Sequence, residues 1–361
     1  MQHTLFITGA AGYVGAMLCE QFAKRDDVAR IIALDKEEQP AELRNNEKIT
    51  WITATTNDTS AWGGVVAEMA PDIVIHTAWQ IREMYGHKKR QWELNVEGSD
   101  ALFDFALSAP SVQKLIYFST ASIYGADPSN TFEHHFTEDE PLRENEYLYG
   151  IEKRVVEEHL EEKVAARAAT RVPQVFIVRP AAITGPRGRF GRMRFGLQSA
   201  LSGRLKGSFI YSIIAKLVSR VPATPGWCRQ FIHEDDVNDI IELLAFSDLA
   251  GSYEVFNIVP PGPPVLAPDM ARAVGKRTLN VPPWLIRIAF FFFWHATRGK
   301  VPTARGGWKF YSYPIVMDGS KLTRQYGYVY QHSSHDAFTK TDGRYAHCAA
   351  APVSDESTSN G

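Results

Sequence analysis

Three side chains have the types and spacing needed to move a proton. Tyr149 and Lys153 are four residues apart, so they project from the same face of a helix that is predicted to begin near Tyr149. A phenol with an ordinary pKa of about 10 is a poor base at neutral pH, and a neighbouring ammonium stabilises its phenolate. Thr120 adds a hydroxyl at the end of a predicted strand. Together the three residues predict a general acid–base site.

A second pair with the same spacing shows that spacing alone is insufficient. Tyr85 and Lys89 are also four residues apart, but they lie in the polar stretch Tyr-Gly-His-Lys-Lys-Arg. No strand-end hydroxyl accompanies that pair. Tyr85 is therefore interpreted as an ordinary solvated phenol, whereas Tyr149 is the candidate base; an ordinary packed phenol is the alternative for Tyr149.

A glycine-rich loop provides a candidate cofactor site. The sequence Gly9-Ala10-Ala11-Gly12-Tyr13-Val14-Gly15 joins the predicted strand Leu5–Thr8 to the predicted helix Gly12–Lys24. Glycines at this position permit a tight turn and let backbone amides approach a pyrophosphate at the helix N-terminus. Asp35 ends the next predicted strand, where a carboxylate accepts ribose hydroxyls and repels a 2′-phosphate. The pattern predicts NAD rather than NADP, although the neighbouring Lys36 leaves NADP open.

The elements around these motifs alternate between strand and helix. Short apolar runs that suit strands alternate with segments of helical period, a pattern typical of a parallel sheet covered by helices on both faces. We expect an α/β fold with a Rossmann-type doubly wound parallel sheet. The predicted strands are Leu5–Thr8, Ala29–Leu34, Ile49–Ile52, Ile73–His76, Lys114–Ser119 and Gln174–Val178, and the predicted helices are Gly12–Lys24, Glu93–Ser108 and Tyr149–Ala168.

The second half of the chain departs from this alternation. After Pro180, proline and glycine become frequent, and helical pieces are predicted at Met193–Leu205 and Trp284–Ala296. We expect residues 1–180 to form the Rossmann domain, with returns to the sheet near 231–259, at Phe231–Ile232 and Val255–Val259. Residues 181–345 are predicted to form a smaller, discontinuous C-terminal substrate domain, and 349–361 a disordered tail.

Composition excludes several classes of protein. The 361 residues contain 39 Lys and Arg against 41 Asp and Glu, a net charge of −2, so no global field favours nucleic acid. Cys19, Cys228 and Cys348 match no metal or disulfide spacing, and we predict no metal site. With no basic segment and cleavable apolar stretch at the N-terminus, the expected location is cytoplasmic.

The most apolar run is too short to be a transmembrane segment. Trp284–Trp294 includes Arg287 and would extend roughly 16 Å as a helix, about half of a bilayer core. We interpret it as a buried or lid helix, and the alternative is an interfacial helix whose phenylalanines contact lipid.

Taken together, the motifs resemble those of the extended short-chain dehydrogenase/reductases, in particular the NAD-dependent epimerase/dehydratase branch that includes UDP-glucose 4-epimerases. The resemblance extends from the first strand to about Phe338. The motifs that carry it are Thr8-Gly-Ala-Ala-Gly-Tyr-Val-Gly15, His76-Thr-Ala78, Asn95-Val-Glu-Gly98, Phe118-Ser-Thr-Ala-Ser-Ile-Tyr-Gly125, Tyr149-Gly-Ile-Glu-Lys153, Arg179-Pro-Ala-Ala-Ile-Thr-Gly-Pro186, Phe231-Ile-His-Glu-Asp-Asp236, Tyr313-Pro-Ile-Val-Met-Asp-Gly-Ser-Lys321 and Tyr326-Gly-Tyr.

The resemblance implies a role for each candidate residue. Thr120 would hydrogen-bond the substrate, Tyr149 would exchange its proton, Lys153 would hold the nicotinamide ribose and lower the pKa of Tyr149, and Asn95 would give structural support. In an epimerase, a sugar hydroxyl loses its proton to Tyr149 while the hydride on the same carbon passes to NAD. The keto sugar then turns over, and the hydride returns to its opposite face. A homodimer through the 93–108 and 149–168 helices is also implied. The implied cofactor contacts are Gly9, Ala11, Gly12, Tyr13, Val14, Gly15, Asp35, Thr77, Ala78, Tyr149, Lys153 and Pro180.

Four positions depart from the family pattern. Thr120 replaces the commoner serine, and Thr55 stands where many relatives carry an aspartate that reads adenine. Thr184 replaces a common tyrosine. Trp79 replaces a small residue, so we expect it to contact substrate and to narrow the site near the nicotinamide, which argues against a large sugar.

The second half offers two different substrate classes. From Lys163 through His233 there is no Asp or Glu against 13 Lys or Arg, which predicts either a solvated face or a cradle for a substrate diphosphate. Arg229, followed by Arg187, is the favoured phosphate ligand of a nucleotide-sugar. The apolar segments 210–218 and 284–294 instead favour a hydrophobic alcohol or ketone, as in 3β-hydroxysteroid dehydrogenases, or contact with an anionic membrane surface. The other arginines of this cradle are Arg189, Arg192, Arg194, Arg204 and Arg220.

Two residues near the predicted strand Phe231–Ile232 carry polar side chains that need not act in catalysis. His233 and Asp236 are expected to be structural residues at the junction between the domains. A non-catalytic NAD-binding protein is the remaining alternative. The complete set of Thr120, Tyr149 and Lys153 argues against it, because a binding protein has no need of an ionisable phenol.

Overall fold

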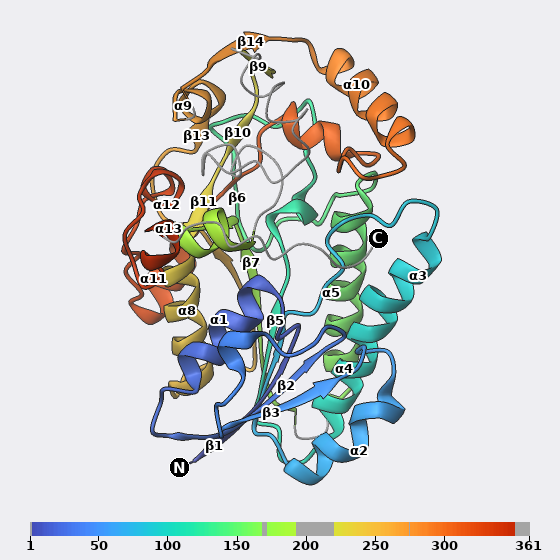
Figure 1. Ribbon diagram of the computed structural model, residues 1–361, viewed down its shortest axis with the longest axis vertical. Helices are drawn as coiled ribbons and strands as arrows, with labels where there is room; N and C mark the ends of the chain where they lie inside the picture. The colour runs from blue at the N-terminus through green and yellow to red at the C-terminus, as the bar shows by residue number, and fades with distance from the viewer. Residues whose placement is uncertain (1, 168–171, 193–219, 274, 351–361) are drawn as a thin grey trace.

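A seven-stranded parallel sheet forms the centre of the protein (Figure 1). The computed structural model describes residues 2–167, 172–192, 220–273 and 275–350. The strand order is β12-β7-β5-β4-β1-β2-β3, which confirms the predicted doubly wound fold. The strands are β1 (His3–Thr8), β2 (Val28–Asp35), β3 (Ile49–Thr53), β4 (Ile73–His76), β5 (Lys114–Phe118), β7 (Gln174–Pro180) and β12 (Tyr253–Ile258).

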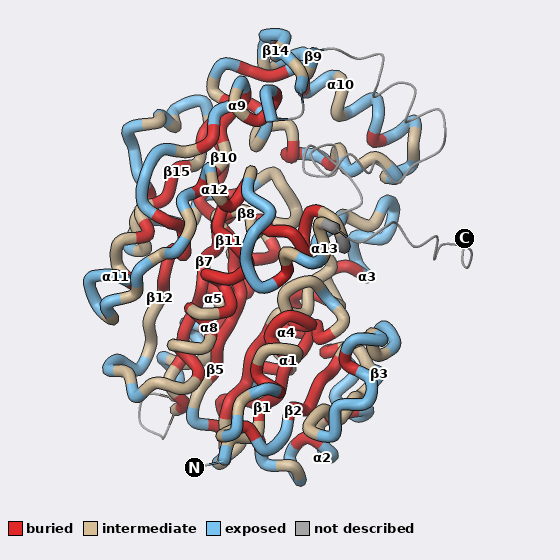
Figure 2. Tube along the Cα trace, turned by 60° about the vertical axis from the view of Figure 1, so that its left-hand side comes forward, coloured by how far each residue is buried: buried red, intermediate tan, exposed pale blue. Residues whose placement is uncertain are grey.

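Helices pack on both faces of this sheet and create two separate cores. On one face lie α1 (Tyr13–Phe22) and α8 (Glu234–Phe246); on the other lie α2 (Thr59–Met69), α4 (Gly98–Ser108) and α5 (Leu148–Ala166). Along β1, Leu5 and Ile7 enter the first core, whereas Phe6 enters the second. Alternate residues of a strand point to opposite faces, so a sheet covered twice requires an uninterrupted apolar run. The buried strands at the centre are visible in Figure 2.

The position of β1 in the sheet creates the site. Its neighbours are β2 on one side and β4 on the other, so the direction of winding reverses at this strand. Connections that leave in opposite directions open a crevice at the carboxyl ends of the strands, where ligands of such sheets bind. The glycine-rich loop after β1 lies at this point.

Outside the central sheet, the strands form short pairs, most of them in the second half of the chain. The pairs are β8 (Ala182–Thr184) with β11 (Phe231–His233), β9 (Arg220–Ala223) with β14 (Arg277–Asn280), β10 (Cys228–Arg229) with β13 (Val265–Leu266), and β6 (His135–Phe136) with β15 (Val316–Met317). The remaining helical elements are η1 (Ala41–Leu43), α3 (Lys88–Trp92), η2 (Glu93–Glu97), η3 (Ala121–Tyr124), η4 (Arg187–Arg192), α9 (Ala267–Arg272), α10 (Pro283–Ala296), η5 (Gly307–Tyr311), α11 (Ser320–Tyr326), α12 (Ser334–Thr339) and α13 (His347–Ala350). Of these elements, β9, β14, α9 and α10 lie at the top of Figure 1.

Several sequence-based expectations differ from these elements. The 255–259 segment returns to the central sheet as β12, but Phe231–Ile232 does not, because β11 pairs with β8 outside that sheet. The predicted helix Glu93–Ser108 divides into a π-helical turn, η2, and α4. The first two residues of the predicted tail, 349 and 350, belong to α13. The predicted helix Met193–Leu205, the apolar segment 210–218 and the rest of the tail lie outside the described residues.

No helix in the described part of the chain combines the length and the apolar character needed to cross a bilayer. The helix of the 284–294 segment, α10, has 14 residues.

A buried ion pair ties the helix that carries Tyr149 to the sheet. The guanidinium of Arg179, at the end of β7, donates to Glu157 of α5, with the closest N···O distance 2.7 Å. The same group donates to the hydroxyl of Tyr124 at 2.8 Å and to the carbonyl of Glu138 at 3.0 Å. Both charged side chains are buried, so each depends on the other for compensation.

Removing one member of this pair should destabilise the protein strongly. We expect Arg179→Met to lower the free energy of unfolding by about 3–5 kcal/mol, because Glu157 is left buried without a partner. Urea unfolding at neutral pH measures the change. The exposed pair Arg272–Asp269 is the control, and Arg272→Met should cost less than about 0.5 kcal/mol. Equal losses in the two variants would contradict the assignment.

Candidate active site

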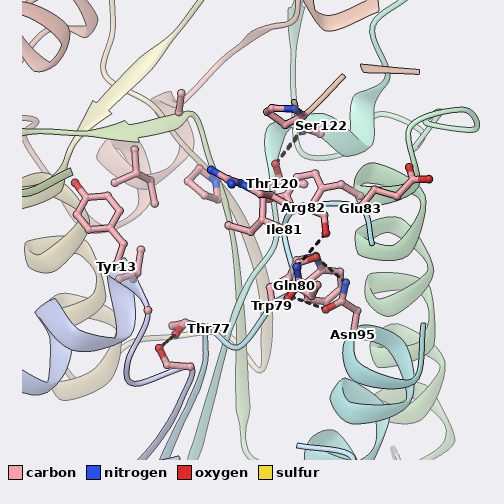
Figure 3. Close-up of a pocket in the computed structure, with 18 of the residues that line it drawn as sticks. Tyr13, Thr77, Trp79, Gln80, Ile81, Arg82, Glu83, Asn95, Thr120 and Ser122 are labelled. Atoms are coloured by element: carbon pink, nitrogen blue, oxygen red, sulfur yellow. Dashed lines mark hydrogen bonds between the residues drawn. The ribbon is translucent and has the colours of Figure 1, made fainter. Parts of the chain in front are cut away.

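A cavity of about 880 Å³ opens at the carboxyl ends of the strands (Figure 3). It extends from the glycine-rich loop to α10 and η5, so both halves of the chain contribute walls. All predicted site residues except Lys153 and Arg187 line it. Those that line it are Gly9, Ala11, Gly12, Tyr13, Val14, Gly15, Asp35, Thr77, Ala78, Trp79, Asn95, Thr120, Tyr149, Pro180 and Arg229.

Two glycines of the glycine-rich loop have no space for a side chain. Gly9 has φ +74°, and a Cβ atom there would lie 2.5 Å from the backbone nitrogen of Ala78. A Cβ atom on Gly12 would lie 2.9 Å from the carbonyl oxygen of Gly9. Gly12 is also the N-cap of α1 and makes no side-chain capping bond, so the first turn presents backbone amides to the cavity. A loop of this kind fits the pyrophosphate of a dinucleotide.

Asp35 fixes the other side of the loop. Its Oδ2 accepts a hydrogen bond from the amide of Ala11 at 2.9 Å, and its Oδ1 accepts one from the amide of Glu37 at 3.0 Å. The carboxylate therefore connects the end of β2 to the glycine-rich loop while it lines the cavity. Its contact with an adenosine ribose remains a prediction.

Tyr13 joins the cofactor loop to the second half of the chain. Its hydroxyl donates to the carboxylate of Glu234, the first residue of α8. The same carboxylate accepts the amides of Arg187 at 2.9 Å and Gly188 at 3.1 Å. Burial raises the pKa of both Tyr13 and Glu234. A residue predicted only to touch the cofactor thus also holds the segment after β8 in place.

A chain of buried hydrogen bonds runs beneath the cavity. Thr8 Oγ1 and His76 Nδ1 are 2.7 Å apart, and His76 Nε2 is 2.8 Å from Ser99 Oγ. Because the Ser99 hydroxyl donates to the carbonyl of Asn95, it accepts from His76, whose Nδ1 then accepts from Thr8. Burial, reinforced by Lys153, lowers the pKa of His76 well below its usual value and keeps the ring neutral.

Asn95 continues this chain and holds the loop that carries Trp79. Its Oδ1 accepts from the amide of Gln80 at 2.7 Å, and its Nδ2 donates to the carbonyl of Gln80 at 3.1 Å (Figure 3). The same Nδ2 donates to Glu152 of α5 at 2.7 Å. These contacts support the structural role expected for Asn95, since its amide is committed to protein partners.

The phenol of Tyr149 lies beside Thr120, as the sequence predicts for an acid–base site. Tyr149 is the second residue of α5, and Thr120 caps η3 by accepting from the amide of Ser122 at 3.2 Å. Burial raises the pKa of Tyr149, whereas a hydrogen bond from Thr120 lowers it. The Thr120 hydroxyl therefore stabilises the phenolate.

Lys153 does not line the cavity, and its contact with the nicotinamide ribose remains a prediction. Its Nζ donates to the carbonyl of Phe118 and lies 3.6 Å from the centre of the Trp79 ring, so the indole stands between the amine and the cavity. Burial lowers the pKa of Lys153 well below its usual value. The two influences on the pKa of Tyr149 are burial, which raises it, and the hydrogen bond from Thr120, which lowers it.

The two favoured arginines have different surroundings. The guanidinium of Arg187 is buried in ion pairs with Glu20 at 2.6 Å and Glu42 at 3.0 Å, and it does not line the cavity. Arg229 does line it, 5.6 Å from the ring centre of Tyr311. The predicted cradle thus retains Arg229, whereas Arg187 has a structural role. Arg194 and Arg204 lie outside the described residues.

His233 and Asp236 lie at the start of α8, where a structural role was expected. Asp236 accepts from the hydroxyl of Tyr328 and from the amide of Gln331, each at 2.8 Å. His233 Nδ1 accepts from the amide of Asp235 at 3.1 Å. Neither His233 nor Asp236 lines the cavity.

Some wall residues were not predicted. Residues 80–83 follow the carboxyl end of β4, a position that could have indicated them. The wall opposite the sheet comes from distant segments that carry no local signal of a site. Its aromatic members are Phe290, Trp294, Phe310, Tyr311 and Tyr313, joined by Tyr147.

The fold and the cavity define a dinucleotide-binding enzyme of the Rossmann class. A sequence model described as "NAD dependent epimerase/dehydratase family" matches residues 5–258. The chain belongs to this NAD-dependent family, as the motifs of the sequence had indicated, and NAD is its cofactor.

Similar proteins cover most of the chain. An uncharacterized protein of Mycobacterium tuberculosis is 26% identical over 337 residues, 92% of this chain and 82% of that protein. Among solved structures, the Bordetella bronchiseptica enzyme WbmG in complex with NAD and UDP has a TM-score of 0.68 at 21% identity and covers 94% of this chain and 92% of its own. The UDP-glucose 4-epimerase of Thermotoga maritima, solved with UDP-glucose, has a TM-score of 0.66 at 18% identity, with 93% and 96% covered.

Replacing Asp35 tests how the loop selects its cofactor. We expect Asp35→Ser to weaken NAD binding by about tenfold or more, since the predicted ribose contact and the bond to Ala11 are both lost. Its preference for NAD over NADP should also fall. Calorimetric titration with each cofactor measures both effects. Glu38→Ser removes a nearby exposed carboxylate and should change neither; an unaltered preference in Asp35→Ser would contradict the ribose assignment.

Proposed function

We propose that the protein acts on a nucleotide-sugar by transient oxidation of a hydroxyl group, as a 4-epimerase does. The observation that carries this proposal is the hydrogen-bonded pair of Tyr149 and Thr120, which lines the same cavity as the glycine-rich loop. A phenol positioned in this way takes a proton from a substrate hydroxyl and returns it, as the reaction requires in each direction.

The chain's own residues would hold the cofactor and move the proton. When bound, NAD supplies reversible hydride transfer. The bare backbone at Gly9 and Gly12 would hold its pyrophosphate, and Asp35 its ribose. Thr120 orients the substrate oxygen, and Tyr149 removes and restores the proton on that oxygen.

Lys153 has a positioning role in this arrangement. It binds the carbonyl of Phe118, the last residue of β5, two positions before Thr120. Its Nζ atom also lies over the ring of Trp79, which contacts Tyr149 edge to face at 6.4 Å. Lys153 thus fixes both the hydroxyl and the indole that border the reacting group.

A nucleotide-sugar is favoured by the charge in the cavity. Arg229 lines it from the side opposite the sheet and suits a substrate diphosphate. The similar structures of WbmG and of the Thermotoga maritima epimerase, solved with UDP and with UDP-glucose, support the same ligand class.

A second candidate rests on the aromatic wall. Phe290, Trp294 and Phe310 present apolar surface to the cavity, which favours a hydrophobic alcohol that is oxidised with net formation of NADH. Incubation with UDP-, GDP- and dTDP-sugars and with hydroxysteroids separates the candidates. Product epimers without accumulation of NADH support the epimerase, and stoichiometric NADH supports the dehydrogenase.

We also propose a homodimer through α4 and α5, as the family resemblance implies. Lys163 of α5 bonds Asp104 of α4 at 2.9 Å, so the two helices form one continuous surface. Light scattering coupled to size exclusion measures the mass in solution.

The phenol is open to direct test. Tyr149→Phe should lower kcat by about 10²–10⁴-fold while leaving NAD affinity nearly unchanged, because only the exchangeable proton is removed. Tyr85→Phe is the matched control, since Tyr85 has the same spacing to a lysine but does not line the cavity. Turnover of Tyr149→Phe at the rate of the unmodified enzyme would end the mechanistic proposal.

The pH dependence should reveal the contribution of Thr120. A base acts when deprotonated, so kcat/KM rises with pH until the pKa of Tyr149 is passed, and burial places that pKa above its ordinary value. Thr120→Val removes a bond to the phenolate and should move the rising limb to higher pH. Thr120→Ser keeps a hydroxyl and should leave the limb in place. The pH profiles of the three enzymes measure the shift, and coincident limbs would exclude the hydrogen bond as a cause.

A further inference from the structure

The helix α10 exposes a continuous apolar face. The exposed fractions are 61% for Trp284, 56% for Ile288, 69% for Phe291 and 63% for Phe292. These residues follow one another at spacings of four, three and one, which places them on one side of a helix. The helix lies at the edge of the molecule, at the upper right of Figure 1.

The opposite side of α10 is fixed to the protein. Ile286 and Trp294 are buried, and Phe290 and Trp294 line the active-site cavity. The ring of Phe290 contacts Tyr311 with centroids 5.3 Å apart, and Trp294 contacts Tyr85 at 5.4 Å. The exposed aromatic residues are therefore presented by an anchored helix, so their exposure is a property of the folded chain.

The segment of the chain that contains α10 carries charge of a single sign, although Arg272 pairs with Asp269 and Lys309 with Glu146. Residues 270–317 contain no Asp or Glu and eight Lys or Arg, in a chain whose net charge is −2. In the described ranges, Arg287, Arg298 and Lys300 form no salt bridge. The eight cations are Arg272, Lys276, Arg277, Arg287, Arg298, Lys300, Arg305 and Lys309.

We propose that α10 docks the protein on the surface of an anionic lipid bilayer. Aromatic and aliphatic side chains on one face of a helix, with cations around it, suit the boundary between acyl chains and anionic headgroups. A helix of 14 residues is about 21 Å long, shorter than the roughly 30 Å of a bilayer core. It would therefore lie in the plane of the interface, with Phe291 and Phe292 inserted.

Charge also favours a bilayer over a second copy of this chain. In a two-fold pairing of α10 with α10, the same residues would meet on both sides, so Arg287 and the cations that follow the helix would be brought together. An anionic surface neutralises these groups instead. The docking proposal goes beyond the proposed function, and the failure of either leaves the other standing.

Flotation with vesicles tests the proposal on the full-length protein. Vesicles containing about 30% phosphatidylglycerol in phosphatidylcholine should carry the protein, and vesicles of phosphatidylcholine alone should carry much less. Raising the salt concentration should weaken binding, because Arg287, Arg298 and Lys300 are solvent-exposed. Arg298→Gln with Lys300→Gln should reduce this salt dependence.

Paired variants separate the apolar contribution. Phe291→Gln with Phe292→Gln should reduce the partition coefficient by about tenfold or more, because two inserted rings are lost. Val329→Gln replaces an apolar residue that is 76% exposed elsewhere and should leave binding unchanged. Neither substituted phenylalanine lines the cavity, so unaltered NAD binding confirms that the double variant is folded.

Three results would overturn the proposal: no binding to anionic vesicles, equal binding by the Phe291/Phe292 variant, or equal loss in the Val329 control. A concentration-dependent dimer that the Phe291/Phe292 variant abolishes, seen by sedimentation without vesicle binding, would assign the face to a second copy instead.

Discussion

The buried hydrogen-bond chain from Thr8 through His76, Ser99 and Asn95 to Glu152 is the interaction on which the site depends. It connects β1, β4, η2 with α4, and α5, each of which carries a different part of the cavity. Buried polar groups of this kind are costly unless every partner is present, so the chain fixes the relative positions of the elements. The glycine-rich loop, the loop with Trp79 and the helix with Tyr149 are thereby held in one arrangement.

Burial accounts for the chemistry of the groups above that chain. Loss of water raises the pKa of Tyr149 and lowers that of Lys153, so in the absence of ligands both groups favour their neutral forms. The hydrogen bond from the Thr120 hydroxyl lowers the pKa of Tyr149 and so offsets part of the increase caused by burial. The indole of Trp79 separates Lys153 from the cavity. The size of the side chain at position 79 therefore controls whether the Lys153 amine can reach a ligand in the cavity.

The second half of the chain supplies the cavity with a cation and with aromatic surface. Arg229 supplies a cation and α10 an aromatic wall, so polar and apolar recognition occur in the same space. The two faces of α10 have different environments, one lining the cavity and one exposed. If the protein docks on a bilayer through the exposed face of α10, the cavity on the other side of this helix lies close to the bilayer.

The sequence by itself determined the doubly wound sheet, the glycine-rich loop and the pairing of Tyr149 with Thr120. The sheet and the loop depend on short-range patterns, namely apolar runs such as Leu5–Thr8 and glycines where a Cβ atom does not fit. The pairing of Tyr149 with Thr120 was predicted from a hydroxyl that follows a strand and a tyrosine that begins the next long helix. Tertiary structure alone decided the orientation of Lys153, the ion pairs of Arg187 and the pairing of β11 with β8. Each of these results from contacts with residues far away in the chain, Trp79 for Lys153 and Glu20 for Arg187, and no local pattern specifies which distant partner a charged side chain will meet.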